Sequence, residues 1–197
     1  MNLHCVFSGV GGQGIVLASK LIAQAALNND LNVKTAETIG MAQRGGSVVS
    51  HVRIGDRIYS PLVPKRQADT IISFEPGEAV RCIDYLKPDG TVITSDNAVK
   101  PVTDNLLKAP AYKGADMIEY LRKNVKNLII INPDEIYKVS GSNKTLNTAL
   151  IGAASMAGVI PFKLEEIEIA LKKLVKDIFI EVNIKALHAG ANAAERR

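Results

Sequence analysis

The first quarter of the chain alternates between apolar runs, glycine-rich turns and apolar positions at helical spacing. Residues 3–8 are an apolar run that leads directly into a glycine-rich turn, residues 9–14. Over residues 15–26, apolar side chains recur every three or four positions, which is the period of one face of an α-helix. The polar residues 28–30 end this helix, and residues 33–37 predict a second strand. The pattern therefore predicts strand, turn, helix and strand in that order.

A second glycine-rich stretch, residues 40–47, follows the second strand and predicts a loop. Residues 48–54 and Ile58-Tyr59 are rich in residue types that favour strands, and Gly55-Asp56-Arg57 stands between them. This arrangement predicts a β-hairpin, because a Gly-Asp turn suits the tight reversal between two antiparallel strands. A hairpin beside parallel strands would make the sheet mixed.

The rest of the chain continues the alternation and then becomes mainly helical. Residues 68–74 predict a buried strand, Pro76 opens a helix that runs to Tyr85, and Pro88-Asp89-Gly90 predicts a turn before a strand over residues 91–94. The later predicted elements are an extended connection over residues 98–113, a helix over 115–123, a strand over 128–131 and helices over 146–156, 164–175 and 179–194. Together they predict one domain, residues 1–197, built as a three-layer α/β/α sandwich with a mixed, mainly parallel sheet and a helical C-terminal third.

Composition narrows the possible functions. The net charge is only +4, the chain has no Trp, and its lysines are dispersed, so we expect no nucleic-acid binding. No stretch approaches the roughly 18 to 20 apolar residues of a membrane span, and the first four residues lack the features of a signal peptide. We therefore expect a cytoplasmic protein with no membrane partner.

The cysteine count limits the metal chemistry of this chain. Cys5 and Cys82 are its two cysteines, and they cannot supply the four thiolates of a [4Fe–4S] cluster. No metal-ligand spacing occurs among the other residues, so we expect no metal site. Any iron–sulfur chemistry must come from another chain.

The first glycine-rich turn satisfies G-x-G-x-x-G between a strand and a helix, where backbone N–H groups can face a phosphate. Glu37 lies 23 residues after Gly14, near the position of the ribose-binding acid in a dinucleotide-binding fold. One interpretation is therefore an autonomous Rossmann-like dinucleotide-binding oxidoreductase. Against it, a loop and a hairpin follow where a crossover helix is expected. The alternative is a tight turn that lets helix and strand pack closely.

Two blocks of sequence together resemble a known family. The first is Gly9-Val10-Gly11-Gly12-Gln13-Gly14, and the second, residues 40–53, follows the pattern G-x-x-Q-R-G-G-x-V-x-x-x-[VI]-[KR]. The chain resembles the gamma-type subunits or domains of 2-oxoacid:ferredoxin oxidoreductases, most of all the small beta subunit of indolepyruvate:ferredoxin oxidoreductase. Further similar segments are Asp69-Thr70-Ile71-Ile72, Glu75-Pro76, Glu78-Ala79, and Asn147 with Leu150-Ile151-Gly152-Ala153. Thr38-Ile39 departs from many relatives, which bears on the substrate class.

The resemblance implies a fold like domain III of pyruvate:ferredoxin oxidoreductase and a heteromeric enzyme. Such an enzyme oxidatively decarboxylates an aryl pyruvate with coenzyme A as co-substrate and passes electrons to ferredoxin. It implies that a large alpha subunit carries thiamine diphosphate, Mg²⁺ and [4Fe–4S] clusters, and this chain indeed lacks the G-D-G…N-N pattern of thiamine diphosphate binders. This chain would complete the active site and the assembly, with no catalytic residue of its own. A binding module of the same fold without an enzyme partner is the remaining alternative.

The candidate ligand-binding residues lie in the two glycine-rich blocks. We expect the first turn to present backbone N–H groups to an anion of coenzyme A or of the substrate, with Gln13 beginning the helix. Arg44 is the expected charged contact, because a guanidinium binds carboxylate or phosphate bidentately; the alternative is a surface or interface arginine. Glu37 and Gln43 rank second, and His51 is expected to be a structural hydrogen-bonding residue. The full candidate set is Gly9, Gly11, Gly12, Gln13, Gly14, Glu37, Gln43, Arg44, Gly45, Gly46 and Ser47.

Overall fold

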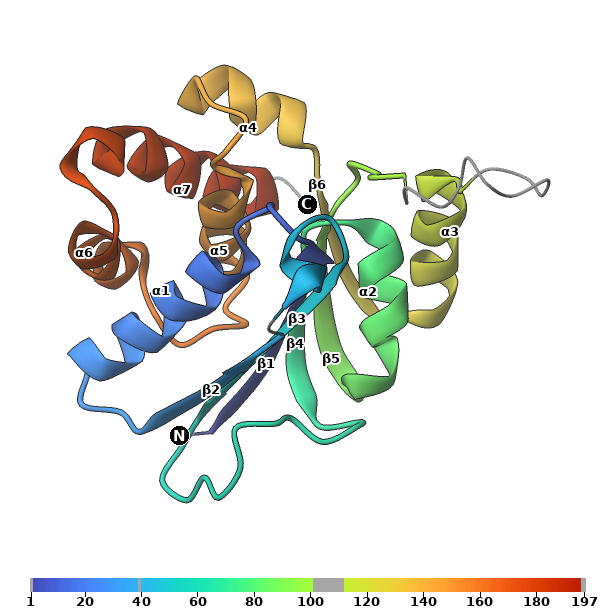
Figure 1. The fold of residues 1–197 in the computed structure, drawn as a ribbon, viewed down its shortest axis with the longest axis horizontal. Helices are drawn as coiled ribbons and strands as arrows, with labels where there is room; N and C mark the ends of the chain where they lie inside the picture. The colour runs from blue at the N-terminus through green and yellow to red at the C-terminus, as the bar shows by residue number, and fades with distance from the viewer. Residues whose placement is uncertain (1, 39, 101–111, 196–197) are drawn as a thin grey trace.

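The structure is a computed structural model that describes residues 2–38, 40–100 and 112–195 (Figure 1). Its centre is a six-stranded sheet in the order β2-β3-β1-β4-β5-β6. β3 runs antiparallel to both β1 and β2, whereas β1, β4, β5 and β6 are mutually parallel. The sheet is therefore mixed and mainly parallel, as the sequence predicts. The strands are β1 (Leu3–Val10), β2 (Val33–Glu37), β3 (Ser47–Ile54), β4 (Ala68–Ser73), β5 (Leu86–Ser95) and β6 (Asn127–Ile131).

One face of the sheet, called here the apolar face, is covered by helices from both ends of the chain (Figure 1). Phe7 and Cys5 of β1 point into this layer and are fully buried, because alternate side chains of a central strand serve opposite faces. Leu150 and its apolar neighbours Leu146, Ile151 and Ala154 on α5 are buried there as well. The helices on this side are α1 (Ile15–Asn28), α5 (Leu146–Met156), α6 (Leu164–Leu174), which packs on α1, and α7 (Ile180–Glu195).

α5 and α7 cross with their main chains in contact. A Cβ atom on Gly152 would lie 1.9 Å from the carbonyl oxygen of Leu187, and one on Gly190 would lie 1.9 Å from the carbonyl oxygen of Ala149. Glycine at both positions is what permits this close approach, because any larger side chain would overlap the opposite backbone.

The opposite face, called here the polar face, has a smaller cover. α2 (Pro76–Cys82), the 3₁₀ turn η2 (Ile83–Tyr85) and α3 (Gly114–Asn124) lie on it (Figure 1). Its apolar cluster includes Val6, Ile71 and Leu121. Helices on both faces make the three-layer sandwich predicted from the sequence. The buried polar residues at and beside this face include Ser8, His51, Ser73, Glu75 and Glu78.

The predicted hairpin between residues 48–54 and Ile58-Tyr59 is wrong. β3 is paired along both edges, with β2 on one side and β1 on the other, so neither edge is free for residues 58–59. The connection after β3 is irregular and is held by Arg53, whose Nη1 donates to the carbonyl oxygens of Ser60 and Leu62 at 3.0 and 3.3 Å.

The predicted turn at Pro88-Asp89-Gly90 is also wrong, because these residues lie inside β5. Leu86 pairs with Ala68 and Thr91 pairs with Thr70, so the register shifts between these two pairs. The extra residues of β5 form an irregularity in the strand rather than a reversal.

The remaining predicted helices and strands are confirmed within a few residues, and one helix was missed. α4 (Pro133–Ser140) begins with Pro at its first position, and the Asn132 side chain accepts from the Asp134 N–H at 2.9 Å. A 3₁₀ turn, η4 (Asp177–Phe179), precedes α7. Most of the predicted extended connection, residues 98–113, lies outside the described residues. Among the described helices, none is both long enough and apolar enough to span a bilayer.

Candidate functional site

The carboxyl ends of β1 and β4 mark the point where the chain changes direction across the sheet. These two strands are parallel neighbours, yet the helix after β1 covers the apolar face and the helix after β4 covers the polar face. In open α/β sheets such a switch point leaves a crevice between the two strand ends, and ligands bind there. The glycine-rich residues 9–14 and the start of α2 both lie at this crevice.

The first glycine-rich turn is tightly closed by its own residues. Gly9 and Val10 belong to β1, and the helix begins at Ile15 after Gly14, which has φ +86°. The prediction that Gln13 begins the helix is therefore wrong. Instead, Gln13 folds back over the turn: its Oε1 accepts from the Val10 N–H at 2.7 Å, and its Nε2 donates to the carbonyl oxygen of Phe74 at 3.4 Å.

The second glycine-rich loop covers part of the first. The Gly11 N–H donates to the carbonyl oxygen of Gly46 at 2.8 Å, and a Cβ on Gly11 would lie 2.4 Å from the carbonyl oxygen of Ala42. In a dinucleotide fold, the second glycine of the motif gives the pyrophosphate access to the backbone. Here the protein's own loop fills that space, so the geometry speaks against the dinucleotide interpretation.

Part of the turn stays open. A Cβ on Gly12 would meet nothing within 4 Å, and in the described part of the chain the N–H groups of Gly12 and Gly14 have no acceptor. Both residues line a pocket of about 310 Å³, called here the turn pocket. It is lined by Gly11, Gly12, Gly14, Ile15, Val16, Gln43 and Val48.

The second loop contains the expected charged contact. Gln43 lies in the short 3₁₀ turn η1 (Met41–Gln43), and its Nε2 donates to the carbonyl oxygen of Thr38 at 3.0 Å. Arg44 is exposed, and its guanidinium has no hydrogen bond or ion pair within the described ranges. Its position leaves the guanidinium accessible to a ligand or to a partner chain.

Glu37 lies elsewhere. Its Oε1 accepts from the Ser19 hydroxyl of α1 at 3.2 Å, and Glu37 does not line the turn pocket. The structure therefore brings Gly11, Gly12, Gly14 and Gln43 together at the turn pocket. The candidates Gln13 and Glu37 make internal hydrogen bonds instead.

A second pocket, of about 320 Å³, lies on the polar side of the same loop and is called here the α2 pocket. Three candidate residues, Gly45, Gly46 and Ser47, line this pocket. The other lining residues are not among the candidates predicted from the sequence. These are Val10, Glu75, Gly77, Glu78, Arg81, Val99, Lys100 and Tyr112.

Two buried glutamates frame the α2 pocket. Glu75 precedes α2 and caps it, since its Oε2 accepts from the Glu78 N–H at 2.9 Å, while its Oε1 accepts from the Tyr112 hydroxyl. Glu78 accepts from the Ser47 hydroxyl at 2.5 Å through Oε2 and pairs with Arg81 through Oε1. Glu75 and Glu78 are only 2% and 3% exposed. The Glu-Pro sequence at the start of the helix was the available signal, because an acidic residue before Pro is typical of a helix start.

Tyr112 donates a hydrogen bond to Glu75 from a neutral hydroxyl group. Burial and the Glu75 carboxylate both raise the pKa of its phenol, so the hydroxyl stays protonated at neutral pH. It also accepts from the Gly77 N–H at 3.0 Å. This tyrosine links the start of α2 to the segment that leads into α3.

The histidine and cysteine side chains show structural surroundings. The His51 Nδ1 accepts from the Val63 N–H at 3.3 Å, its ring packs edge-on against Tyr85 with centroids 5.3 Å apart, and burial lowers its pKa. Burial also raises the pKa of both cysteine thiols, that of Cys82 to about 11. Cys5 and Cys82 lie in the clusters on opposite faces of the sheet, so they cannot bind one metal cluster together. Across residues 2–38, 40–100 and 112–195, no group of three or more His, Cys, Asp or Glu side chains could hold a metal ion.

Comparisons with known proteins give one consistent result. Residues 4–193 match the family model described as "Pyruvate ferredoxin/flavodoxin oxidoreductase". The chain is 41% identical over 196 residues to a protein of Archaeoglobus fulgidus named indolepyruvate oxidoreductase subunit IorB, covering 98% of this chain and 96% of that protein.

Two solved structures have a similar fold. The gamma subunit of a keto/oxoacid ferredoxin oxidoreductase from Geobacter sulfurreducens is 24% identical with a TM-score of 0.72, covering 99% of each chain. The 2-oxoglutarate:ferredoxin oxidoreductase of Magnetococcus marinus, solved with 2-oxoglutarate, coenzyme A and succinyl-CoA bound, is 18% identical with a TM-score of 0.70. That match covers 100% of this chain and 31% of the Magnetococcus chain.

Proposed function

The chain belongs to the pyruvate ferredoxin/flavodoxin oxidoreductase family, and from this premise we propose that it is the small subunit of a heteromeric indolepyruvate ferredoxin oxidoreductase. The complex converts an aryl pyruvate and coenzyme A to the acyl-CoA and CO₂, and it transfers the two electrons to ferredoxin. The chain works in the cytoplasm and is inactive without its larger partner.

A division of labour between two chains supports this proposal. The separated, buried cysteines do not fit an iron–sulfur cluster, which agrees with clusters carried by a large alpha subunit. That subunit also carries thiamine diphosphate and Mg²⁺, which supply the decarboxylation chemistry. The small subunit provides binding, orientation and electrostatics, which are the contributions that a protein makes to cofactor chemistry.

The observation that carries the proposal is the joined pair of glycine loops at the switch point. The hydrogen bond from Gly11 to Gly46 holds the two loops together, and it places the open N–H groups of Gly12 and Gly14 beside the loop that bears Arg44. Backbone donors of the turn and the exposed guanidinium of Arg44 are the groups that would bind an anion, either a phosphate of coenzyme A or the carboxylate of the 2-oxoacid.

The test uses the complex of this chain with its large subunit, produced and purified without oxygen. We expect the complex to reduce ferredoxin or a viologen with indolepyruvate and coenzyme A. A small subunit that purifies alone and colourless, and that retains a nucleotide, would overturn the proposal.

Arg44→Ala should raise the KM for coenzyme A or for indolepyruvate by about tenfold or more, because a hydrogen bond to a charged group contributes about 1.5 to 3 kcal/mol. Arg122→Ala, at an exposed arginine of α3, is the matched control and should leave both KM values unchanged. Normal assembly with unchanged KM values in Arg44→Ala would remove Arg44 from the site.

A further inference from the structure

We infer that the α2 pocket is an anion-binding subsite in which Arg81 and Lys100 recognise a carboxylate or phosphate group. No candidate residue from the sequence supplies this charge, because Gly45, Gly46 and Ser47 contribute only the loop side of the pocket. The inference rests on the proposed function, since the loop that lines the pocket is the one that carries Arg44.

The two carboxylates at the pocket, Glu75 and Glu78, are buried, and their oxygens already accept hydrogen bonds. Both oxygens of Glu75 accept hydrogen bonds, one from the Glu78 N–H and the other from the Tyr112 hydroxyl. Both oxygens of Glu78 are also used, one by the Ser47 hydroxyl and the other by Arg81. A buried carboxylate with its acceptors occupied is a poor ligand for an incoming cation or amine.

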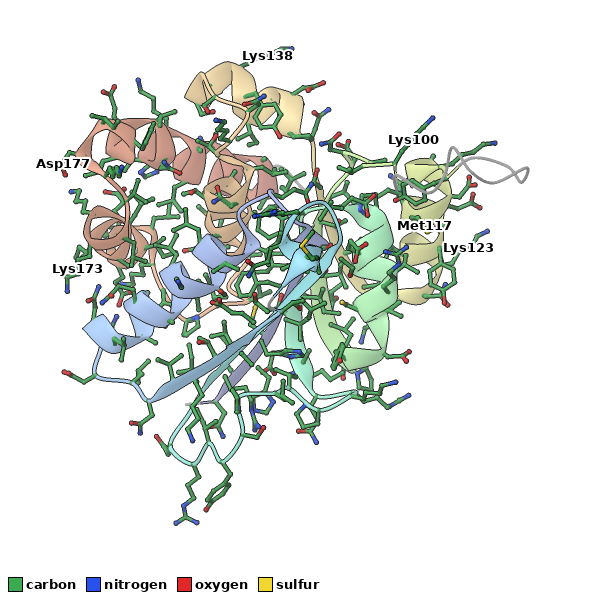
Figure 2. The ribbon with its side chains drawn as sticks, viewed as in Figure 1. Lys100, Met117, Lys123, Lys138, Lys173 and Asp177 are labelled. Carbon is green, nitrogen blue, oxygen red and sulfur yellow. The ribbon has the colours of Figure 1, made fainter. Side chains whose placement is uncertain are left out.

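The free groups at the pocket are donors. The Arg81 side chain is 61% exposed although its partner Glu78 is buried, and the ion pair uses only Nη1 of the guanidinium. The other guanidinium N–H groups are therefore accessible from the pocket and from solvent. Lys100 is exposed, lines the same pocket and forms no ion pair within the described residues. Figure 2 shows Lys100 on the side of the sheet that α2 and α3 cover.

Pairing with Glu78 also prepares Arg81 for recognition. One end of a planar, delocalised guanidinium is fixed by a buried carboxylate, so less side-chain freedom is lost when the other end binds a ligand. Lys100 adds a second positive charge that no buried carboxylate neutralises. The pocket therefore combines a donor paired with a buried carboxylate and an exposed donor without an ion pair in the described residues.

The size of the pocket limits what it can hold. About 320 Å³ is near the lower end for small-molecule sites, so the pocket accommodates a small anion or the anionic end of a larger ligand. In the assembled enzyme such a group comes either from the carboxylate of the 2-oxoacid or from a phosphate of coenzyme A. The two sources share the same recognition chemistry, and kinetics can separate them.

The experiment compares three variants in the assembled complex. Lys100→Gln removes a charge that has no partner in the described chain, so folding should not change. Arg81→Lys keeps the charge opposite Glu78 but loses the planar, two-pronged donor. Lys20→Gln, at an exposed lysine of α1 that does not line the pocket, is the matched control for net charge.

We expect Lys100→Gln to raise one KM by about threefold to tenfold and Arg81→Lys to raise the same KM by about tenfold, while kcat stays within about twofold of the wild-type value. A higher KM for coenzyme A identifies a phosphate, and a higher KM for indolepyruvate identifies the 2-oxoacid carboxylate. Lys20→Gln should change neither KM. Two unchanged KM values in both pocket variants of an active complex would overturn the inference.

A wild-type complex without 2-oxoacid-dependent activity would instead overturn the proposed function, and calorimetry then tests the pocket directly. Inorganic pyrophosphate and indolepyruvate are titrated into the wild-type protein, into Lys100→Gln and into Lys20→Gln. Saturable binding of either probe that weakens in Lys100→Gln but not in Lys20→Gln supports the anion subsite. Absence of binding, or equal binding in all three proteins, overturns it.

Discussion

The two faces of the sheet differ in what they bury. The apolar face packs side chains such as Phe7 and Leu150 against four helices, and α5 and α7 cross there in backbone contact. The polar face has two helices among the described residues, and beside its smaller apolar cluster it buries Glu75 and Glu78. The comparison indicates that one face stabilises the fold while the other fixes donors and acceptors at the crevice.

The physical basis of this difference is the cost of burying each kind of group. Apolar burial stabilises by roughly 25 cal/mol per Å², without any requirement on direction. A buried carboxylate stabilises little on net, and it becomes costly when one of its partners is lost. Substitutions on the apolar face should therefore change stability, and substitutions on the polar face should change ligand binding.

The largest expected effect comes from a cavity on the apolar face. Leu150→Ala removes a fully buried side chain and should lower the free energy of unfolding by about 3 to 4 kcal/mol. Urea denaturation followed by circular dichroism measures this change. In the complex that still assembles, both KM values should match the wild type. A loss of stability below about 1 kcal/mol would contradict the assignment of α5 to the main core.

A smaller loss should follow from separating α5 and α7. Gly152→Ala places a methyl group against the carbonyl oxygen of Leu187 and should cost about 2 to 3 kcal/mol, because the helices must move apart. Met156→Ala, at the exposed end of the same helix, is the control and should change stability by less than about 1 kcal/mol. Equal stability of Gly152→Ala and the wild type would show that the two main chains do not touch.

On the polar face, a substitution by alanine should change ligand binding more than it changes the free energy of unfolding. Ser47→Ala removes the hydroxyl that donates to the buried Glu78, so we expect a loss of about 1 to 2 kcal/mol in the free energy of unfolding. The same change removes the hydrogen bond that holds the loop beside Gly46, and it should raise the KM for coenzyme A or for indolepyruvate. Ser47→Thr keeps the hydroxyl and should restore both values at least in part. A KM that stays at the wild-type value in Ser47→Ala would weaken the contrast between the two faces.

The smallest effect concerns pH. Burial lowers the pKa of His51 in the folded protein, so the unfolded chain binds a proton first as the pH falls below about 6.5. The contribution of His51 to stability is therefore complete above that pH and is lost as the pH falls toward the folded pKa. His51→Phe should flatten the fall in unfolding free energy over this window. Between pH 7.5 and 8.5 the two proteins should show the same slope, and identical slopes below pH 6.5 as well would contradict the assignment.

Local patterns predicted most of the fold. The run before the first turn and the repeat after it identified β1 and α1, because the spacing of apolar residues reflects burial directly. The hairpin prediction failed because the partners of β3 are β1 and β2, and strand pairing is a long-range property. The turn prediction at Pro88 failed because residues typical of turns also occur at irregularities inside strands.

The candidate site was predicted in part. The glycines of the first turn lie at the crevice because their motif sits between a strand and a helix, which fixes its place in the fold. The hydrogen bond of Gln13 to Phe74 could not be foreseen, since Phe74 lies 61 positions along the chain. Arg81 and Lys100 carry no motif, and only folding brings them beside the second loop.

The central position of β1 also affects how the protein folds during synthesis. β1 is made first, but it pairs with β3 and β4, and the apolar face of the sheet is completed by α5 and α7 from the far end of the chain. At roughly 5 to 20 residues per second, the ribosome needs about 6 to 24 seconds to pass from β4 to the end of α7. During that interval the nascent chain exposes an apolar sheet surface, so its yield in the cell should depend on chaperones that bind such surfaces.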